Sequence, residues 1–233
     1  MAHNQGEVRA ATAIALLVIV RTFLCEPFFI PSASMYPTLA NRDQIAVEKF
    51  SRLASTPRRG DIVVFRPPPK FFENVAPREA PSNDGEFRNR KLVKRVVAVS
   101  GDTVEVRGGV LIVNGDPRYE PFTAEQPRYT MSPTSVPEGT IFVLGDNRND
   151  SDDSHLWGPV PIDNVVGKAF YVLYPPSRQG FIDQFMQDIE VTGDASAFIE
   201  RARESLQQQP ANGIATPSMT RGLSRLRPSL KSR

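Results

Sequence analysis

Residues 91–99 have the sequence KLVKRVVAV, a run rich in β-branched side chains with Lys94 near its middle. Such runs, bounded by glycine and proline, are typical of β-strands. The same character recurs at residues 61–65 (DIVVF), 141–144 (IFVL) and 165–174 (VVGKAFYVLY). Residues 103–107 and 110–113 flank Gly108-Gly109, so we expect them to form a hairpin. The sequence therefore predicts a mostly β fold built on an antiparallel sheet.

Composition excludes several classes of protein. The chain has 233 residues, enough for one domain of ordinary size with additional segments. With one cysteine, Cys25, and two histidines, it can form neither an internal disulfide nor a Cys/His zinc site, so we expect no metal. The net charge of +2 is not that of a nucleic-acid-binding protein, and basic residues without acidic ones gather after Pro210.

The most apolar stretch begins at residues 10–20 (AATAIALLVIV) and continues to residue 30. As a helix, residues 10–30 would extend ~31 Å, which matches the ~30 Å hydrocarbon core of a bilayer. Arg21 would reach the membrane interface, and Pro27 marks the end of the helix. We therefore expect a short segment, residues 1–9, and then a transmembrane anchor. A buried core helix and a cleavable secretory signal are the alternatives.

The rest of the chain divides into two parts. Residues 31–176 are expected to form the β-rich domain, with a Pro-rich, charged loop at residues 66–90. Residues 177–233 form a C-terminal extension, in which a helix from residue 183 to 209 precedes a basic tail whose composition favours disorder.

Ser34 lies in PSASMYPTL (residues 31–39), a rigid turn that suits a nucleophile and also suits an ordinary loop. A serine nucleophile needs a base. His155 with a nearby aspartate would complete a triad, although carboxylates this close in sequence rarely fold back to orient the imidazole. Lys94 is the other candidate, because burial among its apolar neighbours would lower its pKa and leave the amine neutral. The alternative for Lys94 is a solvent-facing position on an edge strand.

A third cluster, residues 145–159 (GDNRNDSDDSHLWGP), is rich in oxygen atoms. A calcium loop fails, because Arg148, Ser151 and Trp157 stand where a ligand, a glycine and a glutamate are needed. An ordinary polar loop held by Asx turns is the other interpretation. The chain has no Gly-rich phosphate loop and no dinucleotide fingerprint, so we expect no cofactor.

Five segments, in this order, resemble type I signal peptidase, the membrane-bound serine protease that removes leader peptides from translocated proteins. They are Arg21-Thr22-Phe23, PSASMYPTL at 31–39, GDIVVF at 60–65, KRVVAVSGD at 94–102 and GDNRNDSDDSHLWGPVP at 145–161. The resemblance implies a hydrolase with a β-rich domain, in which Ser34 is the nucleophile and Lys94 the general base.

The resemblance also implies roles for neighbouring residues. The Ser32 hydroxyl and the Ser34 backbone N–H would form the oxyanion hole, and Ser151 would hydrogen-bond the Lys94 amine. Three further residues would brace the site from behind: Asp146, Arg148 and Asp153.

His155 departs from the family's pattern, since many bacterial members have arginine at this position. An ion pair between His155 and Asp153 would be titratable rather than permanent. Together with the segments Ser-Met-Tyr-Pro-Thr-Leu and Trp-Gly-Pro, His155 makes the chain look like the cyanobacterial and plastid thylakoidal branch.

The resemblance implies what the protein acts on and where. We expect cleavage of preproteins after small residues at −1 and −3, with the leader bound as an added strand against shallow pockets walled by Phe28, Ile30 and Val93.

Signal peptides and the lipid bilayer would be partners, and nucleic acid would not. We expect a single-pass membrane protein whose catalytic domain faces the trans side, either outside a bacterial plasma membrane or in the thylakoid lumen. A self-cleaving Ser/Lys regulator and a catalytically inactive, membrane-anchored binding module remain alternatives.

Overall fold

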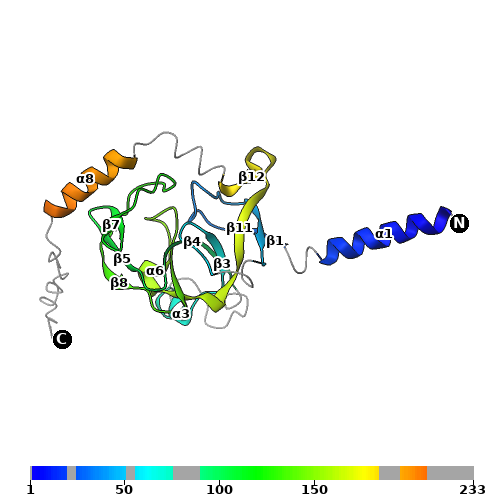
Figure 1. Cartoon of the computed structure of the whole chain (residues 1–233), viewed down its shortest axis with the longest axis horizontal. Helices are drawn as coiled ribbons and strands as arrows, with labels where there is room; N and C mark the ends of the chain where they lie inside the picture. Colours follow the sequence, from blue (N-terminus) through cyan, green and yellow to red (C-terminus); the bar gives the residue numbers. More distant parts are fainter. Residues whose placement is uncertain (1, 20–24, 51–55, 76–89, 184–194, 209–233) are drawn as a thin grey trace, which may run out of the picture.

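Two antiparallel sheets make up the body of the protein. The computed structural model describes residues 2–19, 25–50, 56–75, 90–183 and 195–208 (Figure 1). Within these residues the larger sheet has eight strands, in the order β1-β2-β11-β3-β4-β9-β10, with β12 paired to β11. They are β1 (Cys25–Phe29), β2 (Gln44–Glu48), β3 (Ile62–Phe65), β4 (Leu92–Val99), β9 (Thr140–Leu144), β10 (Val160–Pro161), β11 (Val165–Tyr174) and β12 (Gly180–Phe181). The smaller sheet has the order β7-β6-β5-β8 and consists of β5 (Thr103–Arg107), β6 (Val110–Val113), β7 (Asp116–Pro117) and β8 (Met131–Ser135).

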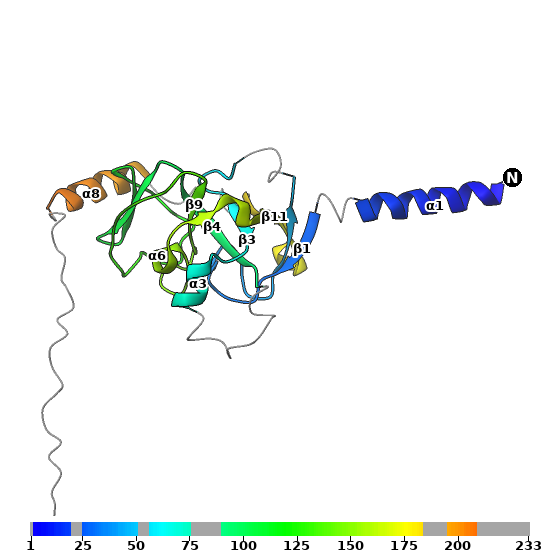
Figure 2. The same ribbon diagram turned by 90° about the horizontal axis from the view of Figure 1, so that it is seen from below.

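Helices flank the two sheets. The short helices α3 (Pro69–Asn74) and α6 (Ser154–Trp157) pack against each other, and the rings of Phe71 and Trp157 meet edge to face at 5.3 Å. The 3-10 helices η2 (Ile162–Asn164) and η3 (Pro176–Arg178) lie at the two ends of β11. Helix α8 (Ala195–Gln208) covers the smaller sheet by packing Ala202 with Val110 and Ile112. Helix α1 (Ala2–Ile19) leads away from the strands in both Figure 1 and Figure 2.

Strand β4 lies between β3 and β9, and its two faces meet different cores. Side chains alternate along a strand, so Lys94 shares a face with Leu92 and Val96 and lies opposite Val63 of β3. Leu92, Val96 and Val63 belong to a cluster with the two packed rings of α3 and α6. Val93 points to the other face, into a second cluster. A lysine at position 94 is therefore set into an apolar wall by register alone.

The predicted antiparallel β fold is confirmed, since every strand pair in the described residues is antiparallel. Each predicted strand is present within a residue or so of its expected bounds, in the regions 61–65, 91–99, 103–107, 110–113, 141–144 and 165–174. The hairpin turn at Gly108 and Gly109 has φ values of 59° and 78°, which glycine adopts without a steric penalty. Strands β1, β2 and β8 and the two-residue strands β7, β10 and β12 were not predicted.

The anchor was predicted at residues 10–30, but its last described residues, 25–29, are not helical. Cys25–Phe29 form β1, which pairs with β2 at the edge of the larger sheet. Pro27 is compatible with this position, because a residue without an N–H is tolerated in an edge strand. In the part of the chain that the structure describes, no helix combines the length and the apolar character needed to cross a bilayer.

Two other predicted segments are partly described. The loop expected at residues 66–90 contains helix α3, whose start is favoured by proline at its first position. Residues 76–89 lie outside the described residues, as do residues 184–194 and 209–233, which include the basic tail. The helix expected from residue 183 to 209 is present as α8 from Ala195 to Gln208.

The Asp102 side chain is hydrogen-bonded to three segments of the chain that connect strands. Its carboxylate accepts hydrogen bonds from the Val99 backbone N–H at 2.7 Å, from Asn114 Nδ2 at 2.9 Å and from Arg59 Nε at 2.8 Å. Burial raises the pKa of this carboxyl, but the hydrogen bonds and the Arg59 charge outweigh burial and lower the pKa to about 2.

We expect this carboxylate to make the protein more stable at neutral pH than in acid. A pKa below its value in the unfolded chain contributes stability that is present above pH ~4 and is lost as the pH falls toward 2, about 2 kcal/mol in all. Denaturant unfolding between pH 7 and 2 should show Asp102→Asn less stable than wild type at pH 7, with the gap closing below pH 4. Asp116→Asn, at an exposed carboxylate, is the control, and a gap that does not change with pH would contradict the prediction.

Candidate active site

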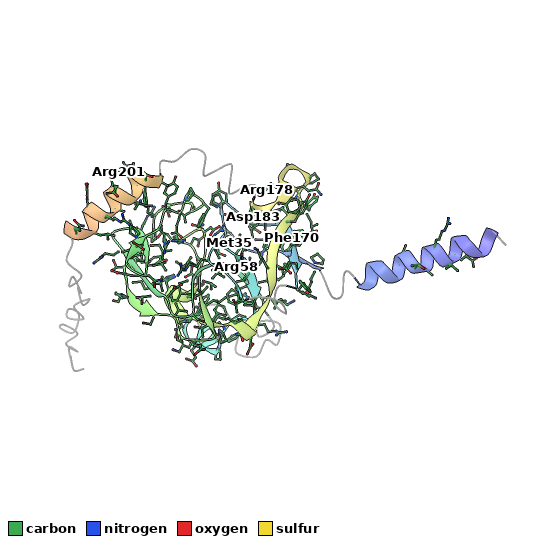
Figure 3. All side chains as sticks on the ribbon, viewed as in Figure 1. Met35, Arg58, Phe170, Arg178, Asp183 and Arg201 are labelled. Atoms are coloured by element: carbon green, nitrogen blue, oxygen red, sulfur yellow. The ribbon has the colours of Figure 1, made fainter. Side chains whose placement is uncertain are left out.

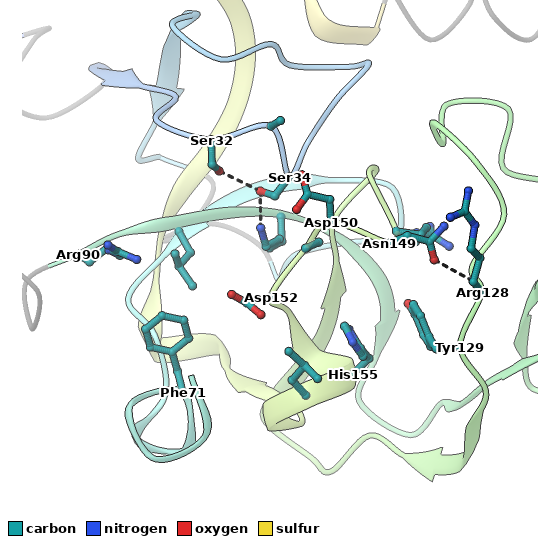
Figure 4. Close-up of a pocket in the computed structure, with 16 residues that line it drawn as sticks. Ser32, Ser34, Phe71, Arg90, Arg128, Tyr129, Asn149, Asp150, Asp152 and His155 are labelled. Atoms are coloured by element: carbon teal, nitrogen blue, oxygen red, sulfur yellow. Dashed lines mark hydrogen bonds between the residues drawn. The ribbon is translucent and has the colours of Figure 1, made fainter. Parts of the chain in front are cut away.

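Ser34 and Lys94 meet in a cavity at one face of the larger sheet. Oγ of Ser34 and Nζ of Lys94 are 2.6 Å apart, within hydrogen-bond distance (Figure 4). Ser34 lies on the turn between β1 and β2, and the base of this turn is closed by hydrogen bonds between Ile30 and the pair Arg42 and Asp43. Met35 and Leu39 are buried beside the turn, so hydrophobic packing holds the serine in place.

Lys94 is 4% exposed. Burial lowers the pKa of its amine, and this effect exceeds the opposing influence of Asp153, Asp152, Asp146 and Asp150, whose charges raise the pKa. A lysine with a lowered pKa is neutral in a larger fraction of molecules, and only the neutral amine can accept the hydroxyl proton of Ser34. The geometry and the protonation state therefore both suit a general base.

Ser32 lies beside Ser34. Its Oγ is 3.3 Å from Oγ of Ser34, and the side chain is exposed to the cavity (Figure 4). The Ser34 carbonyl accepts a hydrogen bond from the Asn147 backbone N–H at 3.1 Å, and the Asn147 side-chain amide contacts the Ala33 carbonyl at 3.3 Å. Asn147, in the segment after β9, thus hydrogen-bonds the carbonyl groups of both Ala33 and Ser34. The oxyanion-hole role of Ser32 and of the Ser34 N–H stays a prediction.

Asp153 organises the loop that follows β9. Its buried carboxylate accepts hydrogen bonds from the Gly145 backbone N–H at 2.9 Å and from Ser151 Oγ at 2.6 Å. The contact predicted for Ser151 was with the Lys94 amine, whereas the hydrogen bond that the structure shows for Ser151 goes to this carboxylate. A charged carboxylate two residues away is a strong competitor for a hydroxyl donor. Ser151 still lines the cavity that contains Ser34 and Lys94.

His155 is held between Asp153 and Tyr129. Its Nδ1 lies 2.7 Å from Asp153 Oδ1, and its ring stacks on Tyr129 at 4.4 Å between centroids. Burial raises the pKa of Asp153, but the His155 contact and the other hydrogen bonds outweigh burial, and the net pKa is lowered. The base in hydrogen-bond contact with the Ser34 hydroxyl is Lys94, whereas the contacts of the His155 ring are with Asp153 and Tyr129.

Two buried ion pairs support the same loop. Asp146 is fully buried, and its carboxylate accepts hydrogen bonds from Arg95 Nε at 2.8 Å, Arg95 Nη2 at 2.7 Å and Thr38 Oγ1 at 2.5 Å. Arg148 forms a two-pronged pair with Glu120 at 2.5 and 2.7 Å, which outweighs burial and raises the arginine pKa.

The partners in these pairs were missed by the sequence analysis. Arg95, Thr38 and Glu120 are single polar residues outside the cluster at 145–159. The one available signal was a charged residue, Arg95, inside an otherwise apolar strand and directly after Lys94.

The cavity beside the dyad has a volume of about 690 Å³. Its apolar lining comes from Phe71, Leu92 and Leu156, and its polar lining includes Asp150 and Asp152 (Figure 4). Phe28, Ile30 and Val93, the expected pocket walls, lie instead with the cluster on the other face of β4. Their role in substrate binding stays a prediction. In the described residues no group of His, Cys, Asp and Glu side chains is arranged to hold a metal ion.

The comparisons of this sequence with known proteins agree on one family. The sequence model of a family described as signal peptidase, peptidase S26, matches residues 6–174. The chain is 46% identical over 169 residues to thylakoidal processing peptidase 1 of Arabidopsis thaliana, which covers 72% of this chain and 48% of that one. It is 40% identical over 173 residues to probable signal peptidase I-1 of Synechocystis, covering 74% of this chain and 83% of that one.

The chain spans about half the length of the plant relative and most of the cyanobacterial one. A solved signal peptidase I of Enterococcus faecalis aligns with 49% of this chain and 97% of its own, at 29% identity and a TM-score of 0.35.

Gly145 is placed where a side chain would disrupt the site. A Cβ atom at this position would lie 2.3 Å from Ser151 Oγ and 2.5 Å from the Ser34 carbonyl oxygen. Gly145→Ala must therefore displace the backbone that carries Ser34, and we expect it to lower the free energy of unfolding by about 1–3 kcal/mol. Urea unfolding measures the loss. Gly6→Ala, where a Cβ meets nothing within 4 Å, is the control, and equal stability of the two variants would contradict the contact.

Proposed function

The chain belongs to the signal peptidase family, peptidase S26, and from this premise we propose that it is a serine endopeptidase that removes signal peptides from preproteins with a Ser34–Lys94 dyad. The match includes both thylakoidal and cyanobacterial relatives, in agreement with the branch that the sequence resembles. The observation that carries the proposal is the 2.6 Å separation between the Ser34 hydroxyl and a buried lysine amine.

In the proposed reaction, neutral Lys94 accepts the Ser34 proton while Oγ attacks the scissile carbonyl carbon. The carbonyl oxygen becomes an oxyanion, stabilised by the Ser32 hydroxyl and the Ser34 backbone N–H. The protonated lysine then donates its proton to the leaving amine, the C–N bond breaks and an acyl-enzyme remains. Lys94 next takes a proton from a water molecule, the hydroxide attacks the ester, and the proton returns to Ser34.

The lysine environment supports this chemistry. Lowering the pKa of a lysine costs interaction free energy, which the surrounding fold has to supply. Apolar packing provides this free energy, because Lys94 lies opposite Val63 of β3 and between Leu92 and Val96 on its own face of β4. Two of the four aspartates whose charges would keep the amine protonated, Asp153 and Asp146, accept hydrogen bonds from other partners.

We place the leader peptide in an extended conformation between the turn that carries Ser34 and the start of β4. Glu26 on β1 pairs with Lys91 at 3.0 Å, so the chain segments leading to the two reactive residues lie side by side. An extended chain added there would present alternate side chains to the enzyme at −1 and −3. Apolar walls close to the dyad would reject large side chains by steric clash.

Membrane attachment belongs to the same proposal. It is supported by the apolar composition of residues 10–20 and by the short linkage to the folded body, since β1 begins at Cys25, five residues after that stretch. A single-pass anchor would therefore keep the dyad near the bilayer surface, on the trans side. A leader's own apolar helix would deliver its cleavage site to that depth.

Substitution of the dyad tests the proposed activity. The full chain in detergent is incubated with a precursor that has an Ala-x-Ala site, and cleavage is followed on gels. We expect Ser34→Ala and Lys94→Met each to lower the rate at least about 10³-fold, because both residues act as one unit. Lys70→Met, at an exposed lysine on α3, should retain full activity. Normal cleavage by Ser34→Ala would refute both the nucleophile and the protease assignment.

The rate should also depend on pH in a direction set by Lys94. Because the base works only when neutral, we expect kcat/KM to fall as the pH decreases through the lowered lysine pKa. The profile is measured from pH 5 to 9, with circular dichroism at each pH to confirm that the chain stays folded. A flat profile would exclude a lysine base that titrates in this range.

A further inference from the structure

The chain that follows β11 returns to the turn that carries Ser34. After Tyr174, helix η3 ends at Arg178, and β12 then pairs back onto β11 (Figure 3). This segment begins where the match to the family model ends, at residue 174. Nothing in the dyad geometry or in the family match assigns it a role.

Arg178 makes several contacts with the turn between β1 and β2. Its Nε donates to both oxygens of Asp43, at 3.2 and 3.1 Å. Its Nη2 donates to the Thr38 carbonyl at 3.0 Å and to the Pro37 carbonyl at 3.4 Å. One guanidinium group thus binds a carboxylate and two successive peptide carbonyls, which a rigid planar fork of donors can do.

Asp43 is the centre of this arrangement. It is 1% exposed, and its Oδ2 also accepts the Ala40 backbone N–H at 2.8 Å. A buried carboxylate needs a counter-charge, because an unpaired charge in a low-dielectric interior is costly. Arg178 supplies that charge, and the same contact fixes the turn three to nine residues after the nucleophile.

The turn is held from its other side by the network behind Lys94. Thr38 Oγ1 donates to Asp146, and Asp146 is paired with Arg95, the residue after Lys94 on β4. Thr38 therefore has its carbonyl on Arg178 and its hydroxyl on the support of the general base. The two ends of the dyad are linked through this one residue.

We propose that Arg178 is a positioning residue for the dyad: it holds the Pro37–Asp43 turn so that Ser34 lies within reach of Lys94. The inference rests on the proposed function, and it gives the start of the C-terminal extension a part in catalysis. Small displacements matter here, since a misplacement of about 1 Å is enough to cost up to about 10²-fold in rate.

The first test compares kinetics and stability of Arg178→Ala with a matched control. Arg203→Ala removes an arginine that also pairs with an aspartate, Asp116, but lies on α8. We expect Arg178→Ala to lower kcat about 10- to 100-fold with KM within about threefold, because the turn positions the nucleophile rather than the leader. Arg203→Ala should keep wild-type kcat. Wild-type kcat in a folded Arg178→Ala variant overturns the inference, as does a loss fully explained by the fraction unfolded.

Two further variants keep the test valid if Arg178→Ala folds poorly. Arg178→Lys retains the charge but not the fork, so we expect partial recovery of kcat. Asp43→Asn should lower kcat. The double variant with Arg178→Ala should have a kcat no lower than that of the more impaired single variant, because both substitutions remove one contact. Full additivity of the two losses would contradict the shared contact.

Amide hydrogen exchange separates this inference from the proposed function. The N–H groups of Leu39, Ala40 and Asp43 are hydrogen-bonded within the turn, and we expect them to exchange at least about tenfold faster in Arg178→Ala. The amides of β9 should not change. If the wild-type chain cleaves no precursor, the proposed function fails, while faster exchange still supports the positioning role and unchanged exchange still refutes it.

Discussion

Keeping one lysine amine away from water is the constraint on which the rest of this structure depends. Lys94 is placed by register on the face of β4 that meets Val63 and the packed rings of α3 and α6. Its pKa falls because that environment disfavours the charged form, in spite of four aspartates in the neighbourhood. Without the apolar wall the amine would stay protonated, and the 2.6 Å contact with Ser34 would have no chemical consequence.

Two of the four aspartates near the amine, Asp146 and Asp153, have hydrogen-bond partners of their own. Asp146 is matched by Arg95 and Thr38, and Asp153 by His155, Ser151 and a backbone N–H. Buried pairs of this kind contribute little net stability, because desolvation offsets the attraction. What they supply is geometry: they connect the loop after β9 to the turn that carries Ser34 and to the strand that carries Lys94.

Much of the fold follows from local sequence patterns. Strand Val110–Val113 consists of β-branched and apolar residues, as does Leu92–Val99 apart from Lys94 and Arg95, and both are buried on both faces. Strand β1 could not be recognised this way, because its sequence CEPFF continues an apolar run that also suits a membrane helix. Its strand character comes from pairing with β2, a contact between segments separated by a turn. Helix α3 likewise depends on packing with α6 rather than on its own six residues.

The types of chemistry at the site were already determined by the linear order of residues: a serine in a rigid turn, a lysine in an apolar strand, and a polar loop with its aspartates and a histidine. Only the tertiary structure decided which groups touch. Alternation along β4 sends Val93 to the opposite face from Lys94. The loop after β9 brings the Ser151 hydroxyl to Asp153 rather than to the amine. Glu120 and Arg178 reach the site from positions that carry no motif. Strand propensity and motif spacing are local properties, whereas hydrogen bonds and ion pairs between distant residues exist only once sheet register has brought their backbones together.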